Sequence, residues 1–160
     1  MPGLLPFDRA VREHGPVVLR VCRAVLGSAD EADDAWQETF LAALRAYPGL
    51  DPTTNLRAWL VTVAHHRCVD LLRARERRAV PTAELPEPVS PAPAEEADRD
   101  RSLRDAVAAL PGRQRQAVAL HHLGGLTWAE VAELVGVTEA AARRAGSDGV
   151  AALRGTGGWR

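Results

Sequence analysis

The stretch TWAEVAELVGVTEAAARRAGSDGVAALR, residues 127–154, decides the fold, because it contains two helix starts and one tight turn. Thr127 and Glu130 form a capping box at the first start. Gly136 supplies the left-handed backbone that ends a helix, and Thr138 caps the helix that follows. This arrangement is typical of a helix-turn-helix unit, whose second helix enters the major groove of DNA. The alternative is a packing hairpin of the kind found in many helical proteins.

The second helix of this unit carries few side chains that can contact bases. Arg143 and Arg144 are its best-placed cations, whereas the surrounding alanines offer no hydrogen bonds. Gly146 and Gly149 each cost about 1 kcal/mol relative to alanine inside a helix. We therefore expect this helix to end early, to bend or to depend on packing.

The composition excludes several classes of protein. The 160 residues are 46% hydrophobic and 26% charged, which suits one globular domain or two small ones. The formal net charge is −1, so a nucleic-acid site requires local segregation of charge. No apolar run is long enough to cross a membrane, and the N-terminus lacks a signal pattern. We expect a cytoplasmic protein without membrane insertion.

Metal, cofactor and catalytic sites are not indicated. The two cysteines lie far apart and form no CxxC motif. The neighbours His65 and His66 cannot point the same way on a helix, and the same holds for His121 and His122. The C-terminal glycines follow no strand and open no helix, and no nucleophile, base and orienting group occur together. We predict a protein that is not an enzyme and holds no cofactor.

Charge is segregated along the chain in blocks of alternating sign. Residues 27–51 hold six acidic residues and one arginine, whereas residues 56–78 hold six arginines and two acidic residues. Residues 79–100 hold six acidic residues and one arginine, and residues 101–160 hold eight arginines and five acidic residues. Such blocks favour separate binding faces. The alternative is a set of solvated helix faces in an arginine-rich chain.

Apolar spacing predicts helices within residues 4–26, 28–46 and 55–78, with an interruption of the first at Gly15-Pro16. The second helix is amphipathic, and its predicted apolar stripe consists of Ala32, Trp36, Phe40 and Leu44. The predicted buried face of the third helix consists of Leu56, Leu60, Val63, Ala64, Leu71 and Leu72.

The polar faces of these helices suit two different partners. The helix dipole explains acidic residues in the first turn of the second helix but not Gln37 and Glu38, so an exposed face for a protein partner is a competing interpretation. The arginine-rich third helix suits contact with a nucleic-acid backbone, and Trp59 suits stacking on an unpaired base. The alternative for Trp59 is a place in the core.

Residues 79–100 differ from the rest of the chain. They contain five of the 11 prolines, six acidic residues and no aromatic residue, which predicts an extended linker. The helical pattern resumes at Ser102, stops at Leu110 before Pro111, and continues through residues 112–123.

The predicted architecture is all-α, with two small helical domains. Its parts are a helical domain at 1–78, a linker at 79–100, a helix-turn-helix domain at 101–154 and a tail at 155–160.

Three segments occur in a fixed order along the chain: DEADDAWQETFLAALRAY (30–47), NLRAWLVTVAHHRCVDLLRARERR (55–78) and LPGRQRQAVALHHLGGLTWAEVAELVGVTEAAARR (110–144). Taken together, they resemble bacterial RNA polymerase sigma factors of the small, two-domain extracytoplasmic-function type. The resemblance spans nearly the whole chain. It implies a subunit that binds core RNA polymerase and directs recognition and opening of promoter DNA. An anti-sigma factor is a further partner that it implies.

The resemblance also implies a role for each matched segment. The residues implied to bind core polymerase are Asp34, Gln37, Glu38 and Leu41. Those implied to lie at the melted −10 strand are Asn55, Arg57, Trp59, His65, His66 and Arg67. Those implied to contact the −35 duplex are Arg143 and Arg144, supported by Arg113 and Arg115. Capture of unpaired bases traps the opened duplex, so promoter melting needs no catalytic group.

The second helix of the helix-turn-helix unit, which the resemblance implies is the recognition helix, departs from the family pattern. Ala145, Gly146, Ser147 and Asp148 stand where the family usually carries basic residues, and Asp148 would repel phosphate. We therefore expect weak or shape-dependent reading of the −35 element. Two alternatives remain at this point: a stand-alone helix-turn-helix repressor, and a sigma-like interaction module with weak DNA reading.

Overall fold

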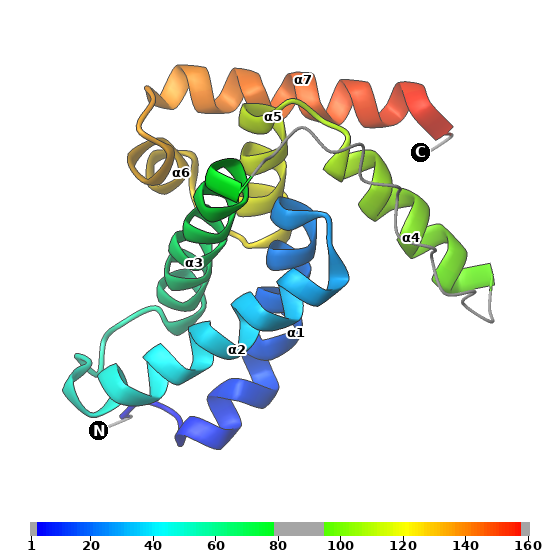
Figure 1. Cartoon of the computed structure of the whole chain (residues 1–160). Coiled ribbons are helices and arrows are strands. Elements are labelled where there is room, and N and C mark those ends of the chain that lie inside the picture. The colour runs from blue at the N-terminus through cyan, green and yellow to red at the C-terminus, as the bar shows by residue number, and fades with distance from the viewer. Residues whose placement is uncertain (1–2, 79–94, 158–160) are drawn as a thin grey trace.

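The computed structural model describes residues 3–78 and 95–157, and within them the regular structure is helical, without strands. This confirms the predicted all-α class (Figure 1). In chain order the elements are α1 (Phe7–Leu26), α2 (Ala29–Ala46), the 3₁₀ turn η1 (Tyr47–Gly49), α3 (Leu56–Arg78), α4 (Glu95–Ala108), α5 (Gly112–Ala117), the π-helical segment η2 (Val118–Leu123), α6 (Trp128–Val135) and α7 (Glu139–Gly157).

Helices α1, α2 and α3 pack on one another and form the N-terminal domain. Val18, Val21 and Val61 are fully buried in its core, as are Cys22 of α1 and Cys68 of α3. The hydrogen bond with the Cys22 thiol, and secondarily burial, raises the pKa of the Cys68 thiol above its ordinary range. Both cysteines are free thiols.

Helix α1 continues through Gly15-Pro16, so the predicted interruption is wrong. Proline removes one backbone donor, but packing against α2 holds the helix together at this point. Trp36 Nε1 donates to the Gly15 carbonyl at 2.9 Å. A Cβ atom at position 15 would lie 3.3 Å from the Trp36 ring, so a glycine allows the two helices to approach closely.

The buried side of α2 differs from the predicted stripe at its C-terminal end. Phe40 and Ala43 are buried, whereas Leu44 is 51% exposed, so the prediction for Leu44 is wrong. The side of the helix that faces the core passes through Ala35, Thr39 and Ala43, and this turns position 44 outward.

In the C-terminal domain, α4 begins at Glu95, inside the predicted linker and before the expected start at Ser102. The predicted linker residues 79–94 lie outside the described residues. The helix predicted at 112–123 is present as α5 followed by η2; Gly124 caps the end of η2, and Gly125 follows with a φ of +75°.

The helix-turn-helix unit is present with the predicted caps. The Thr127 hydroxyl accepts the Glu130 N–H at 3.1 Å, and the Glu130 carboxylate accepts the Thr127 N–H at 3.0 Å. Gly136 has a φ of +81°, and the Thr138 hydroxyl accepts the Ala141 N–H at 3.1 Å. These contacts fix both ends of the turn between α6 and α7.

Helix α7 does not end at its internal glycines, because both lie in close packing contacts. A Cβ atom at Gly146 would lie 2.2 Å from the Trp128 ring, and one at Gly149 would lie 2.8 Å from Val118. Of the three outcomes expected for this helix, dependence on packing is the one that the structure shows. In Figure 1, α7 lies across one end of the molecule beside α5, and α1, α2 and α3 form the opposite part.

Candidate functional site

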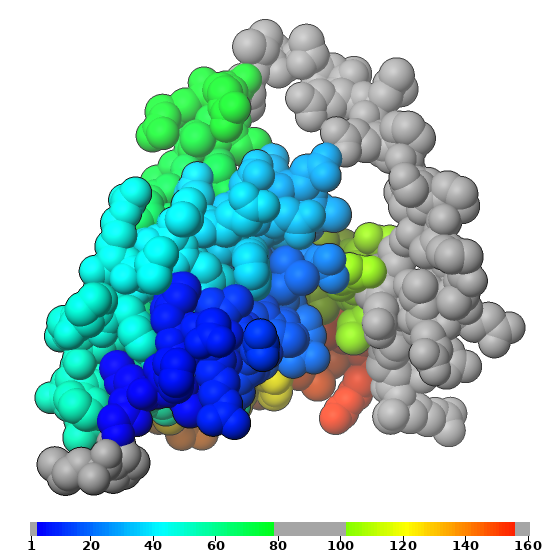
Figure 2. All heavy atoms as spheres, turned by 90° about the horizontal axis from the view of Figure 1, so that it is seen from below, coloured from blue at the N-terminus to red at the C-terminus, as the bar shows by residue number. Residues whose placement is uncertain are grey.

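The outer face of α2 presents the side chains predicted to bind a protein partner. Asp34, Gln37 and Glu38 are exposed, and Leu41 is 56% exposed. Leu44 lies close by along the helix and extends this face. In Figure 2 the atoms of α2, light blue to cyan, face the viewer with no atoms of the C-terminal domain over them. Helix α2 therefore exposes two large apolar side chains beside carboxylates.

Exposure divides the predicted DNA contacts along α3. Asn55, Arg57 and His66 are exposed, whereas Trp59 and Arg67 are half-buried. The Asn55 side chain accepts the Ala58 N–H at 3.2 Å and so caps the helix. Trp59 packs against the hydrophobic core, in agreement with the alternative interpretation for this residue.

His65 is buried, with 3% of its surface exposed. Its Nε2 atom donates to Gln116 Oε1 of α5 at 3.2 Å. Burial lowers the pKa of His65, the bond to Gln116 opposes this shift, and the neighbouring His66 adds to it. Position 65 lies on the inner side of α3 with Val61 and Cys68, so His65 faces α5 in this conformation, and its contact with DNA stays a prediction.

Arg143 and Arg144 project from α7 into solvent, with side chains that are 60% and 85% exposed. Arg143 Nη2 donates to Glu139 Oε1 at 2.9 Å, and Arg144 Nε lies 4.0 Å from Asp148 Oδ2. Each cation thus lies one helical turn from a carboxylate. Exposed pairs of this kind are weak, so both guanidinium groups can turn toward a ligand.

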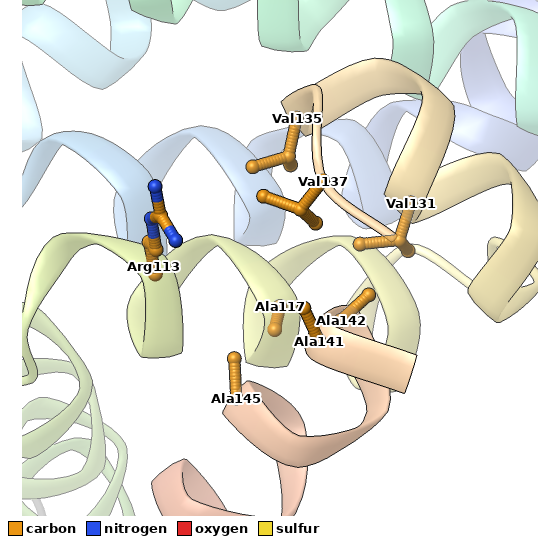
Figure 3. Close-up of a pocket in the computed structure, with 8 residues that line it drawn as sticks. All are labelled: Arg113, Ala117, Val131, Val135, Val137, Ala141, Ala142 and Ala145. Carbon is orange, nitrogen blue, oxygen red and sulfur yellow. The ribbon is translucent and has the colours of Figure 1, made fainter. Parts of the chain in front are cut away.

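The alanines of the recognition helix pack the helix-turn-helix unit together. Ala142 is 2% exposed, and Ala145 lies with it in a hollow of about 20 Å³ between α5, α6 and α7 (Figure 3). Val131 and Val137 line the same hollow, and Arg113 borders it from α5. Packing therefore explains the lack of polar groups on this side of α7. Arg113 itself stays exposed.

Arg115 lies apart from the other predicted −35 residues. It is half-buried, and its Nη1 donates to the Val25 carbonyl at 3.1 Å, in the last turn of α1. Arg75 of α3 donates to the next carbonyl, that of Leu26, at 3.2 Å and pairs with Glu31. Both arginines satisfy carbonyl groups at the negative end of α1, so Arg115 is not placed at DNA in this conformation.

An aromatic stack before the helix-turn-helix unit was not predicted from the sequence. The His121 ring stacks on Trp128 with centroids 3.8 Å apart, and His121 Nδ1 donates to the Leu126 carbonyl at 2.7 Å. His122 meets the same indole edge-on. The adjacent histidines therefore support the position of Trp128, which in turn contacts Gly146 of α7.

Comparison with known proteins identifies both domains. Residues 10–78 match the family model of Sigma-70 region 2, and residues 100–153 match that of Sigma-70, region 4. RNA polymerase sigma factor CarQ of Myxococcus xanthus is 31% identical over 157 residues, which cover 92% of this chain and 87% of CarQ. The chain is a sigma factor of the extracytoplasmic-function type.

Further relatives agree with this assignment. ECF RNA polymerase sigma factor SigM of Mycobacterium tuberculosis is 32% identical over 139 residues, covering 83% of this chain and 67% of SigM. Sigma factor RpoE of Bartonella quintana, solved with the anti-sigma factor NepR, matches with a TM-score of 0.73 at 19% identity. The match covers 93% of this chain and 94% of RpoE. At that identity, RpoE supports the fold alone.

As a sigma factor, the chain binds core RNA polymerase and promoter DNA and directs promoter recognition in transcription initiation. Sigma factors are not enzymes, and the function rests on binding surfaces. In the part of the chain that the structure describes, no group of three or more His, Cys, Asp and Glu side chains could hold a metal ion. In the same residues, no helix is both long and apolar enough to span a bilayer.

Proposed function

We propose that this sigma factor uses three separate binding surfaces. The first is the outer face of α2, which binds core RNA polymerase. The observation that carries this assignment is the exposure of Leu41 and Leu44 beside Gln37 and Glu38. Large apolar side chains grouped on a surface and flanked by polar groups mark protein interfaces. The acidic neighbours favour a basic partner surface, and they add specificity and association rate more than affinity.

A binding measurement with core polymerase tests this assignment. We expect Leu41→Ser combined with Leu44→Ser to weaken binding by about tenfold or more, because apolar anchors dominate such interfaces. Gln37→Ala with Glu38→Ala should give a smaller loss. Glu13→Ala, at an exposed position on α1, serves as the matched control, and circular dichroism checks that every variant folds. Unchanged affinity in the double leucine variant would remove the docking assignment.

The exposed part of α3 is the proposed contact for the melted −10 strand. Arg57, His66 and Arg67 supply cations and a flat ring along one helix, and Asn55 lies at its start. Cations follow the phosphate backbone, and rings stack on unpaired bases, so binding energy holds the opened strand. We leave His65 out of this surface because it is buried against Gln116.

Arg143 and Arg144 are the proposed contacts to the −35 duplex, with Arg113 in support. Both α7 arginines are exposed near the start of the second helix of the helix-turn-helix unit, where such helices meet base edges. The neighbouring carboxylates of Glu139 and Asp148 limit the attraction to phosphate, so we expect weak −35 affinity. Footprinting of the polymerase-bound chain with Arg143→Ala and Arg144→Ala variants tests the contact.

We also propose an anti-sigma partner and a cytoplasmic location. RpoE, which shares this fold, was solved with the anti-sigma factor NepR, and CnrH, which also shares it, was solved with the cytosolic domain of CnrY. The cytoplasmic location follows from the place of core polymerase. We propose domains at 1–78 and 101–154, close to the two family matches. Co-purification of the chain from its own cells tests the partner.

A further inference from the structure

A cleft of about 360 Å³ lies where α1, α3 and α5 meet, outside the three binding surfaces proposed above. Sites for small molecules in proteins are concave and have volumes of about 300–1,000 Å³, so this cleft can hold an ion or a small metabolite. Val25 of α1 is buried and Leu72 of α3 is half-buried, and together they give the cleft an apolar wall. The remaining side chains that line it are polar or charged.

Two arginines line the cleft, and each is anchored through one nitrogen atom. Arg115 Nη1 donates to the Val25 carbonyl at 3.1 Å. Arg75 Nη2 donates to the Leu26 carbonyl at 3.2 Å and pairs with Glu31. A guanidinium group has five N–H donors and no acceptor. Among the described residues, Arg115 Nη2 and Arg75 Nη1 have no hydrogen-bond acceptor, so these donors remain available for a ligand.

Gln116 adds an oriented amide group beside these cations. Its Oε1 atom accepts a hydrogen bond from His65 Nε2 at 3.2 Å, which fixes the amide and leaves its NH₂ group as a donor. Gln116 follows Arg115 directly on α5, and both side chains are half-buried. Three side chains from two helices thus present donors that neighbouring contacts hold in place. Groups that are already oriented lose little conformational freedom when a ligand binds.

The charge of the lining residues favours an anion. Of the described residues that line the cleft, Arg75 and Arg115 are cationic and Glu76 is acidic. Glu31 pairs with Arg75 from outside the lining and offsets part of its charge. Glu76 is exposed, so its carboxylate can turn into solvent, whereas Arg115 is half-buried and bonded to α1. Charges that are partly removed from water interact more strongly than exposed ones, so Arg115 dominates the field in the cleft.

We infer that this cleft binds a phosphoryl group, either as free phosphate or as part of a small phosphorylated metabolite. Guanidinium groups match phosphate oxygens in pairs, and these charge-assisted hydrogen bonds are about twice as strong as neutral ones. The oxygens of a phosphoryl group do not lie in one plane, and this suits donors that come from two helices. The apolar wall at Val25 and Leu72 is the contact for the rest of a metabolite. The inference does not depend on the polymerase and promoter surfaces.

Isothermal titration calorimetry with the full chain and inorganic phosphate, at constant ionic strength, tests the site. We expect Arg75→Gln to weaken phosphate binding by about tenfold, because a charge-assisted contact is lost. Glu76→Gln should strengthen it by about two- to fivefold, because the opposing carboxylate is removed. Arg73→Gln is the matched control, since Arg73 is an exposed cation on the same helix that does not line the cleft.

Two results of the calorimetry would overturn the inference. The first is absence of phosphate binding to the unaltered chain at millimolar concentration. The second is an equal loss of affinity in Arg73→Gln and Arg75→Gln, which would mean that phosphate binds the exposed cations of α3 without using the cleft. Circular dichroism checks that each variant folds.

A second probe distinguishes free phosphate from a phosphorylated metabolite. Phenyl phosphate carries the same phosphoryl group on a flat apolar ring. Binding that is about threefold or more tighter than that of inorganic phosphate would assign a metabolite, because the ring then buries apolar surface against Val25 and Leu72. Leu72→Ala should remove this advantage. Equal or weaker binding would assign the free ion, and both assignments support the phosphoryl site.

Thermal denaturation gives an independent measurement. A ligand that binds only the folded chain raises the midpoint temperature as its concentration increases. Phosphate also stabilises proteins by exclusion from their surface, so the response must be compared between variants. We expect phosphate to raise the midpoint of Arg73→Gln more than that of Arg75→Gln. An equal rise in the two variants would contradict the phosphoryl site.

Discussion

Helices α3 and α7 both carry side chains expected at DNA, yet different features limit them. On α3, the contact with the C-terminal domain buries His65, while Arg57 stays exposed beside Gly125. On α7, Arg143 and Arg144 stay in solvent, and each has a carboxylate one turn away. The first surface is limited by access and the second by charge. Access can be changed by moving a domain, whereas the charge on α7 can only be changed by mutation or by salt.

The largest expected effect comes from a mutation that disturbs the packing of α7 against Trp128. Gly146→Ala places a methyl group 2.2 Å from the Trp128 ring, and we expect it to lower the free energy of unfolding by about 1–3 kcal/mol. Gly155→Ala is the matched control in the same helix, because nothing lies within 4 Å of its Cβ, so it should be neutral or stabilising. Thermal denaturation followed by circular dichroism compares the two.

The adjacent residues His65 and His66 on α3 allow a buried position to be compared with an exposed one. We expect His66→Ala to reduce formation of the open promoter complex by about tenfold, in line with the 1–3 kcal/mol measured for stacking on a base. His65→Ala should not reduce it, because that side chain is turned toward Gln116. Permanganate footprinting of the melted strand measures both. An equal loss in the two variants would place His65 at DNA in the open state.

A pH titration tests the burial of His65, and its expected effect is smaller. Burial lowers the pKa of His65 below its ordinary value of 6.5, so the unfolded chain binds the proton more readily than the folded chain. The contribution of His65 to the free energy of unfolding should be constant above about pH 6.5 and should fall as the pH drops below that value.

His122 shifts in the same direction, through burial and then His121, and must be separated from His65. Thermal denaturation at pH 7.5 and below 6.5 should show a weaker pH response in His65→Gln than in His122→Gln if the buried contact between His65 and Gln116 causes the response. The reverse order would assign the response to the aromatic stack around Trp128.

The smallest expected effect concerns charge on α7. Asp148→Asn removes the carboxylate beside Arg144, and we expect −35 duplex affinity of the polymerase-bound chain to rise by about two- to fivefold, since exposed pairs contribute about 0.2–1 kcal/mol. Filter binding at two salt concentrations measures it. A decrease would mean that Asp148 holds Arg144 in its productive orientation.

Local chemistry made much of the fold predictable. The capping residues Thr127 and Thr138 and the turn glycine Gly136 act within a few residues of their own position, and all three are found in the predicted roles. The exposure of Gln37 and Glu38 was predictable for the same reason, because it follows from the periodicity of one helix.

Several features that the sequence did not reveal involve partners from distant parts of the chain. Trp36 supports α1 at Gly15, and Gln116 encloses His65 across 51 positions. Arg115 caps a carbonyl 90 positions away. The spacing of residues within one helix does not show which distant residue a side chain contacts. A polar residue that faces another domain therefore has the same sequence spacing as one that faces DNA.

The two thiols in the N-terminal core give the molecule an internal reporter. Cys22 and Cys68 sit on different helices, have no exposed surface, and meet each other inside the bundle. An alkylating reagent can reach them only when α1 and α3 separate. Until then the hydrogen bond with Cys22, and then burial, raises the pKa of the Cys68 thiol and keeps the reactive thiolate scarce. The rate of labelling therefore measures opening of this bundle in the unmodified protein, and it distinguishes local unfolding from a hinge movement of the C-terminal domain that leaves the bundle intact.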